Sequence, residues 1–178
     1  TRHRVLEAVL PILSRKNLSV PFARCGEMEL HPEFSDRPLW ESAACYEAAR
    51  GGISPDEVIE RMKVLAKIMA DAVSDGLKGT EYADRILPAQ SPGFTEAEKE
   101  GRLIPADINN RIIRYVSALM EMKSSMGIIV AAPTAGSCGA MPGAVLAIAD
   151  ALGADEDERA RALLVAGLIG VFITRDAS

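Results

Sequence analysis

The stretch APTAGSCGAMPG, residues 132–143, places a cysteine among small residues that would let a bulky bound group approach the backbone. Cys138 is followed directly by Gly139. The preceding Thr134 and Ser137 add two hydroxyl groups. If a helix begins just after the cysteine, its free backbone N–H groups stabilise a thiolate, the form that binds a metal. The loop would therefore suit an iron–sulfur cluster or a substrate carboxylate, whereas the competing interpretation is packing, because free cysteine is commonly buried.

Other sites built on glycine, cysteine or histidine fit the sequence less well. The loop lacks the Lys-Ser/Thr pair that ends a phosphate-binding P-loop, and its glycines are not spaced as in a dinucleotide-binding turn. Cys25 and His31 could begin a zinc site, but no two further soft ligands follow at a recognised spacing. A cysteine-dependent hydrolase stays open as an alternative, and it requires His3 or His31 within hydrogen-bond reach of Cys138.

The composition favours an all-α protein. Its 178 residues are 48% hydrophobic but only 4% aromatic, so the core must be built from Ala, Leu, Ile, Val and Met. That mixture suits packed helices better than a β-sandwich. We therefore expect one helical domain over residues 1–178, incomplete at its C-terminus, with residues 1–50 as an N-terminal portion that the sequence defines less well.

Charge and cysteine content argue against several kinds of partner. The net charge is −5 and no basic stripe is present, which argues against nucleic-acid binding. Three cysteines without a C-x-x-C pair do not resemble a secreted disulfide framework. The longest strongly apolar stretch, residues 162–173, is shorter than the roughly 20 residues that span a bilayer. We expect a cytoplasmic protein that binds neither nucleic acid nor membranes.

Hydrophobic periodicity and capping residues predict where most helices begin and end. Ser54, with Glu57 three residues later, starts a helix over residues 55–75. Asp155 and Glu158 start the last helix in the same way. Further helices are predicted over residues 1–16, 38–50 (where Cys45 is expected to pack), 107–124 and from near Pro142 onward.

Three segments lack such simple signals. Residues 78–105 show weak periodicity and predict a long loop with one helical turn at 95–100, capped by Thr95. Residues 127–133 are a short apolar run that fits either a buried strand or a buried helix. Residues 162–173 are apolar on every side, so we expect the helix over residues 160–173 to be the most buried element.

The sequence MGIIVAAPTAGSCGAMPGAVLAIAD, residues 126–150, closely resembles the signature of the alpha subunit or domain of iron–sulfur-dependent L-serine dehydratase (L-serine ammonia-lyase). The sequence LLVAGLIGVFITRDAS, residues 163–178, resembles the next helix of that family. The resemblance is looser over residues 54–124, and no motif anchors it in residues 1–50. Lys123 departs from the pattern, because relatives often carry Asn there.

The resemblance implies an all-helical catalytic domain that degrades an amino acid. In that family three cysteines hold a [4Fe-4S] cluster whose open iron acts as a Lewis acid on the serine hydroxyl, and a base removes the α-proton to give pyruvate and ammonia. It maps the first ligand onto Cys138, while Thr134, Ser137 and Gly139 become candidates to hold the substrate carboxylate. The catalytic base is not identified. L-serine and a beta domain or subunit are the implied partners, in a homo- or hetero-oligomer.

The resemblance also implies two further ligand cysteines at positions that Cys25 and Cys45 of this chain do not match. Relatives continue past the position of Ser178 into a segment resembling G-G-C-Q-A-E and later supply another cysteine. We therefore expect the 178-residue chain by itself to bind no intact cluster and to be inactive. The alternative from another class is a structural or regulatory helical paralogue that has lost the cluster.

Overall fold

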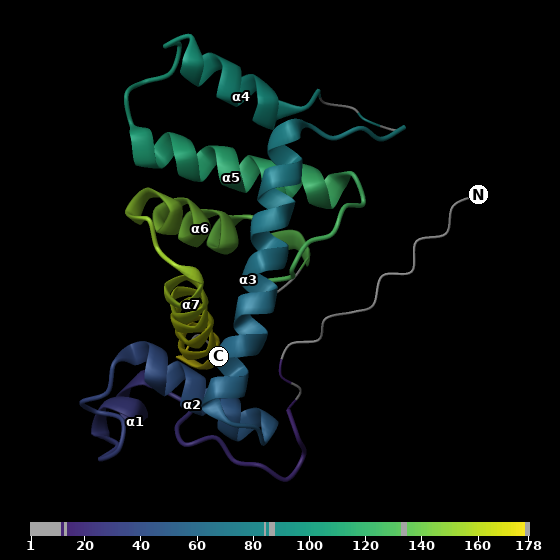
Figure 1. Cartoon of the computed structure of the whole chain (residues 1–178). Coiled ribbons are helices and arrows are strands. Elements are labelled where there is room, and N and C mark those ends of the chain that lie inside the picture. Colours follow the sequence, from purple (N-terminus) through teal and green to yellow (C-terminus); the bar gives the residue numbers. More distant parts are fainter. Residues whose placement is uncertain (1–11, 13, 84, 86–87, 133–134, 177–178) are drawn as a thin grey trace.

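The computed structural model describes residues 12, 14–83, 85, 88–132 and 135–176, and in these residues it contains α-helices and one 3-10 turn but no strand (Figure 1). The prediction of an all-α fold is confirmed. The helices are α1 (Cys25–Leu30), α2 (Leu39–Gly51), α3 (Pro55–Lys78), α4 (Gln90–Lys99), α5 (Asp107–Ser124), α6 (Ala140–Leu152) and α7 (Glu156–Asp176). None of the helices in this part of the chain is long and apolar enough to cross a membrane.

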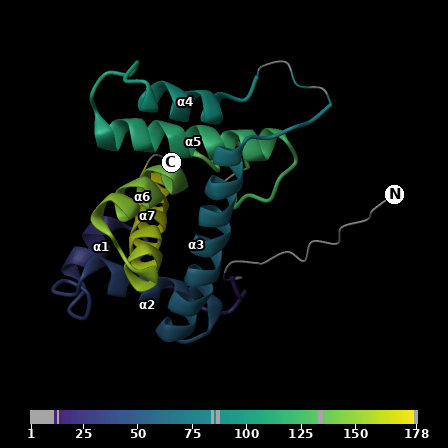
Figure 2. The same ribbon diagram turned by 45° about the horizontal axis from the view of Figure 1, so that its top comes forward.

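The long helix α3 connects two groups of helices (Figures 1 and 2). At one end, α5 lies between α4 and α6, and α3 crosses this layer. At the other end, α3 packs against α2, and α7 runs beside it from one group to the other. Two hydrophobic clusters result. One joins α2 to the first turns of α3 and the last turns of α7, and the other joins α3, α5, α6 and the start of α7.

The capping residues seen in the sequence do begin the helices. The Ser54 hydroxyl accepts the backbone N–H of Glu57 at 3.2 Å, and α3 then continues to Lys78, three residues beyond the predicted end. The Glu57 carboxylate pairs with Arg61. At α7 both halves of the predicted capping box form, because Asp155 accepts the N–H of Glu158 and Glu158 accepts that of Asp155, each at 2.9 Å.

The segment predicted as a long loop contains a helix that was missed. Helix α4 begins at Gln90, five residues before the predicted turn, so the expected cap at Thr95 is wrong. The carboxylate of Glu121, on α5, accepts the backbone N–H groups of Gln90 and Ser91 at the start of α4. This cap comes from 30 residues away in the chain, so no local pattern could reveal it. The Thr95 hydroxyl bonds to the Ser91 carbonyl inside the helix.

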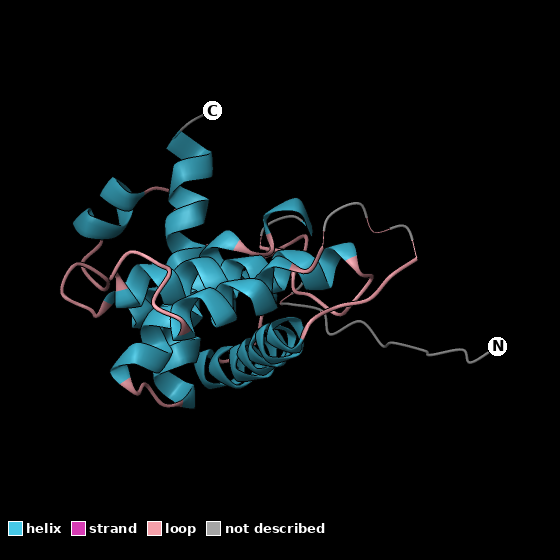
Figure 3. Cartoon of the chain, turned by 90° about the horizontal axis from the view of Figure 1, so that it is seen from above, coloured by secondary structure: helices cyan, strands magenta, loops and turns pink. Residues whose placement is uncertain are grey.

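The expectation that the last helix is buried all round is wrong for this chain. One side of α7 is covered, through Leu163, Leu164, Leu168 and Phe172. On the other side Ile169 is 44% and Ile173 is 63% exposed. Seen from above, the last turns of α7 stand clear of α4, α5 and α6 (Figure 3). The all-round apolar pattern therefore marks a helix with one open apolar face.

Two other predictions concern the N-terminal helix over residues 1–16 and the apolar run over residues 127–133. Most of the predicted N-terminal helix lies outside the described residues, and residues 14–16 are not helical. Residues 127–132 form neither a strand nor a helix, and Pro133 lies outside the described residues. The backbone at Met126, just before them, has a positive φ of 59°, which ends the helical path of α5.

A glycine sets the crossing of α3 and α5. A Cβ atom added at Gly76 would lie 2.4 Å from the carbonyl oxygen of Ala118 and 2.7 Å from its carbonyl carbon. The two backbones therefore touch at this point, and Ala118 is 0% exposed. Only a residue without a side chain permits this contact.

We predict that Gly76→Ala lowers the free energy of unfolding by about 1–3 kcal/mol, the usual range for an overpacked core. Gly170→Ala is the matched control, because it also lies within a helix but a Cβ there meets no atom within 4 Å. Alanine in place of a helical glycine should raise stability by about 0.5–1 kcal/mol. Urea unfolding followed by far-UV circular dichroism measures both. Equal stability of the two variants would refute the crossing argument.

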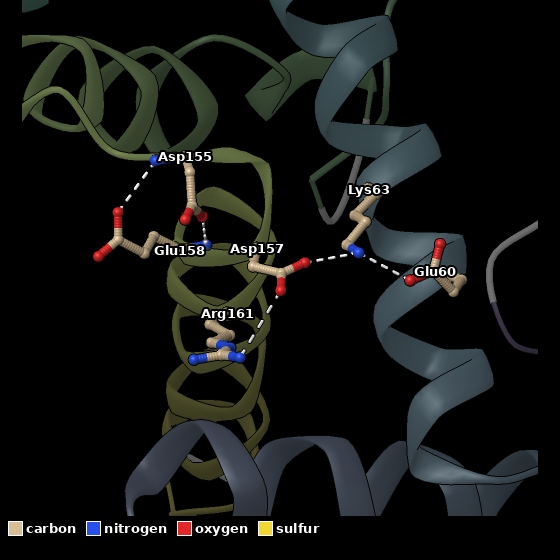
Figure 4. A network of polar contacts seen from close by, with 6 residues as sticks. All are labelled: Glu60, Lys63, Asp155, Asp157, Glu158 and Arg161. Carbon is tan, nitrogen blue, oxygen red and sulfur yellow. Dashed lines mark hydrogen bonds and ion pairs between the residues drawn. The ribbon is translucent and has the colours of Figure 1, made fainter.

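A polar network ties α7 to α3 (Figure 4), and a cation–π contact ties α7 to α2. The Lys63 ammonium of α3 pairs with Asp157 at 2.5 Å and with Glu60 at 2.7 Å. One turn further along α7, the Arg161 guanidinium stacks 4.1 Å above the ring of Trp40 on α2. The hydrogen bond from Lys63 lowers the pKa of Asp157 from its ordinary 3.8, and the hydrogen bond to Asp157 raises the pKa of Lys63.

These shifts predict a pH window for the network. Because the pKa of Asp157 is lowered on folding, its contribution is present above about pH 4 and is lost as the pH falls through its folded-state pKa. Lys63→Met should therefore lower the urea midpoint at pH 7 but have a smaller effect at pH 3. Lys67→Met is the control, since Lys67 pairs with Asp71 on the same helix. The fluorescence of Trp40, the chain's one tryptophan, reports the transition. A pH-independent effect of Lys63→Met would contradict the assignment.

Candidate functional site

The small-residue loop lies between the end of α5 and the start of α6. The backbone N–H of Gly127 donates to the Met122 carbonyl at 2.8 Å and closes the last turn of α5. Residues 127–132 then lead to a 3-10 turn at Ala135–Ser137, directly before Cys138. Helix α6 begins at Ala140, two residues before the predicted start, with Gly139 as its N-cap residue. The prediction that Cys138 sits at the entry to a helix is confirmed.

The loop is held against α5 by glycines. A Cβ at Gly139 would lie 2.9 Å from the Met120 side chain and 3.3 Å from the Val116 carbonyl oxygen. One turn along α6, a Cβ at Gly143 would lie 2.9 Å from the Val116 nitrogen. The absence of both side chains therefore lets the first turn of α6 rest directly on α5. The four-residue spacing of Gly139 and Gly143 places them on one face of a helix, and this spacing in the sequence could have predicted the contact.

The Cys138 thiol is buried in this chain. Cys138 is 1% exposed and belongs to the set of largest fully buried side chains. Ser137, its neighbour, is half-buried and makes a polar interaction. Gly139 is buried against α5, so close packing accounts for its lack of a side chain. Thr134, the third candidate for substrate binding, lies outside the described residues.

The other two cysteines lie at a hydrophobic cluster, apart from the loop. Cys25 and Cys45 pack against the cluster around α2, whereas Cys138 lies two residues before α6 and belongs to neither cluster. The Cys45 sulfur accepts a hydrogen bond from Arg37 at 3.6 Å. Across the described residues, no group of three or more His, Cys, Asp or Glu side chains could hold a metal ion. The described residues therefore supply one thiol at the loop and do not fit a complete four-iron cluster.

The hydrolase alternative finds no base in the described part of the chain. His31 follows the last residue of α1, and its ring lies 4.8 Å from that of Phe34, a member of the hydrophobic cluster around α2. Its Nδ1 atom accepts the backbone N–H of Glu33 at 3.2 Å. His3 lies outside the described residues. A Cys138–His31 pair is therefore not formed.

Lys123 and Glu121 both lie near the end of α5, beside the segment that leads into the loop. Lys123 is half-buried in the last turn of the helix. Glu121 anchors α4 through the backbone N–H groups described above, and its second oxygen is buried. Sequence patterns did not single out Glu121, because a carboxylate within a helix usually marks a solvated face.

Comparison with known proteins assigns the family. The family described as "Serine dehydratase alpha chain" matches residues 10–178, nearly the whole chain. This chain belongs to the serine dehydratase alpha chain family. The resemblance seen in the loop and in α7 is thereby confirmed.

Two curated relatives are similar to this member of the family. One, from Bacillus subtilis (strain 168), is named "Probable L-serine dehydratase, alpha chain"; it is 25% identical over 123 residues, which cover 69% of this chain and 41% of the relative. The other, from Latilactobacillus sakei, has the same name and is 39% identical over 71 residues, covering 40% and 34%. The matches thus span less than half of each relative. No solved structure matches significantly.

Burial predicts how the three thiols react with Ellman's reagent. Cys25 and Cys45 are half-buried and should react in the native chain, whereas the enclosed Cys138 should react only after urea is added. Cys138→Ser should lower the number of reactive thiols in urea from three to two and leave the native number unchanged. Fast reaction of all three native thiols would show that the loop is open.

Proposed function

We propose that this chain forms part of the alpha chain of an L-serine dehydratase, a lyase that converts L-serine to pyruvate and ammonia. The family match over residues 10–178 carries this proposal, because it includes the Cys138 loop and the helices that support it. Both relatives are named as probable L-serine dehydratases, which supports serine as the substrate. Because both are also named alpha chains, we expect a beta chain or domain as partner. The three free cysteines fit a reducing compartment, so we expect the enzyme in the cytoplasm.

Cys138 is our candidate for one ligand of a [4Fe-4S] cluster in the assembled enzyme. Its position at the start of α6 supports this role, because the backbone N–H groups of a helix N-terminus favour a thiolate. The described residues bring no second cysteine to the loop, so the other ligands must come from elsewhere in the assembled enzyme. We expect the 178-residue chain alone to bind no intact cluster after anaerobic reconstitution.

Thr134, Ser137 and Gly139 are our candidates to hold the substrate carboxylate. The support is their place in the sequence just before the first turn of α6, where the helix dipole attracts an anion. The packing of Gly139 on α5 fixes the direction in which this turn points. The residue that removes the α-proton of serine is not identified.

The alternative function is that of a structural or regulatory paralogue that keeps the helical fold but binds no cluster. The observation in its favour is the burial of Cys138, since a thiol that is 1% exposed can serve packing alone. In such a protein Cys138 should tolerate replacement by alanine, with a loss of stability of about 1 kcal/mol.

The deciding experiment replaces Cys138 in an alpha chain that has the full family length and carries this segment, assembled with its beta partner. We expect Cys138→Ser to abolish pyruvate formation and the broad visible absorption of thiolate-bound iron together. Cys45→Ser is the matched control, because Cys45 is a half-buried cysteine at the hydrophobic cluster around α2. It should keep both properties. A Cys138→Ser enzyme with a full iron content and normal turnover would support the packing role instead.

A further inference from the structure

Helix α7 leaves one apolar face open to solvent over most of its length. Five residues share this face, because helical spacing places them on one side of α7: Ala162, Ala166, Ile169, Gly170 and Ile173. Ala166 is half-buried and the other four are exposed. The opposite side of the helix packs into the hydrophobic cluster around α2 through Leu164, Leu168 and Phe172. This set of five residues, the α7 face, is therefore held in a fixed orientation by core packing behind it.

The α7 face lacks the polar groups that a solvated helix surface carries. Residues 162–173 contain no charged, hydroxyl or amide side chain. Ile169 is 44% and Ile173 is 63% exposed. A single exposed isoleucine is common on protein surfaces, but a continuous apolar stripe marks a surface that contacts another protein segment.

Gly170 adds a second observation on the same face. Within the described residues, a Cβ atom added at Gly170 would meet no atom closer than 4 Å. A glycine inside a helix lowers stability relative to alanine, and no neighbour in this part of the chain requires one here. At Gly76, Gly139 and Gly143 of the same chain, the missing side chain admits another helix backbone. Gly170 therefore leaves room for a further helix to approach α7 closely.

The size of the α7 face limits what can cover it. It spans residues 162–173, about 18 Å of a helix about 10 Å wide, which gives an area on the order of 200 Å². A stable complex between separate chains buries roughly 800 Å² on each partner. A segment of the same polypeptide needs less area, because the covalent link gives it an effective concentration in about the millimolar range. The α7 face alone thus suits a covalently linked segment better than a second copy or a separate chain.

We propose that the α7 face is covered, in an alpha chain of full family length, by a further helix of the same polypeptide. This inference rests on the proposed function. The matched residues make up only 41% and 34% of the two relatives, so each relative has more sequence outside the match than within it. The covering helix presents an apolar side to Ile169 and Ile173 and keeps its own charges away, since the α7 face offers them no counter-charge.

The first test measures whether the α7 face is covered. Ile169→Cys is alkylated with iodoacetamide, and peptide mass spectrometry separates its rate from those of the native cysteines. We expect rapid reaction in the 178-residue chain and at least about tenfold slower reaction in the assembled full-length enzyme, because a covered thiol reacts only in the rare open state. Val64→Cys is the matched control, since Val64 is 49% exposed in the middle of α3, and it should react equally in both.

Slow reaction of Ile169→Cys in the 178-residue chain, or rapid reaction in the assembled enzyme, would overturn the proposal. Neither rate depends on iron or turnover. An inactive enzyme that protects position 169 would therefore contradict the proposed function alone, whereas an active enzyme that leaves it exposed would contradict this inference alone.

The second test identifies the segment that covers α7. The photoreactive amino acid p-benzoylphenylalanine replaces Ile173 at the exposed edge of the α7 face, and the assembled enzyme is irradiated. We expect cross-links to alpha-chain peptides outside the segment that corresponds to residues 10–178. Mixing isotope-labelled with unlabelled chains shows whether each cross-link lies within one molecule, as we expect. Cross-links to the beta partner, cross-links between two alpha chains, or none at all would refute the assignment.

Discussion

The arrangement of the helices depends on close contacts that α3 and the start of α6 make with α5. Gly76 of α3 rests on the backbone of Ala118, and Gly139 and Gly143 of α6 rest on Val116 and Met120. In each case a Cβ atom would fall within 3 Å of an atom of α5. Such a close approach is possible only where a glycine faces α5, so the positions of the glycines fix where the helices cross. The orientation of α6, and with it the position of Cys138, is therefore a consequence of contacts with a helix that contributes no candidate ligand.

Much of this fold follows from local sequence signals, because they act within one turn of a helix. Ser54 starts α3 and the Asp155–Glu158 pair starts α7 through bonds between residues three positions apart. Such bonds form wherever the local chain is helical, so the sequence alone predicts them. Helix α4 was missed for the opposite reason, since its N–H groups are satisfied by Glu121 from another helix. Long-range capping of this kind leaves no periodic signal near the helix that it stabilises.

At the candidate site, too, the sequence predicts the features that depend on neighbouring residues and misses those that depend on distant ones. The place of Cys138 before a helix was predictable from neighbouring glycines and from the apolar segment that follows. The packing of the adjacent Gly139 was not, because it rests on Val116 and Met120 of α5, about 20 positions away in the chain. The open side of α7 was likewise unpredictable: composition shows that a helix lacks a polar face, but it does not show which neighbours cover that face. The proposed cluster and the reaction on serine come from the family resemblance, because neither periodicity nor packing indicates them.

Helices α3 and α7 each belong to both hydrophobic clusters. Val58 and Met69 of α3 lie in different clusters, with Met62 packed against both, and Leu163 and Phe172 of α7 are divided in the same way. Unfolding of either shared helix would therefore open both clusters. Amide protons in the middle of α3 should be among the slowest in the chain to exchange with solvent. Helix α4 belongs to neither cluster, so it can detach and exchange its amides while the rest of the molecule remains folded.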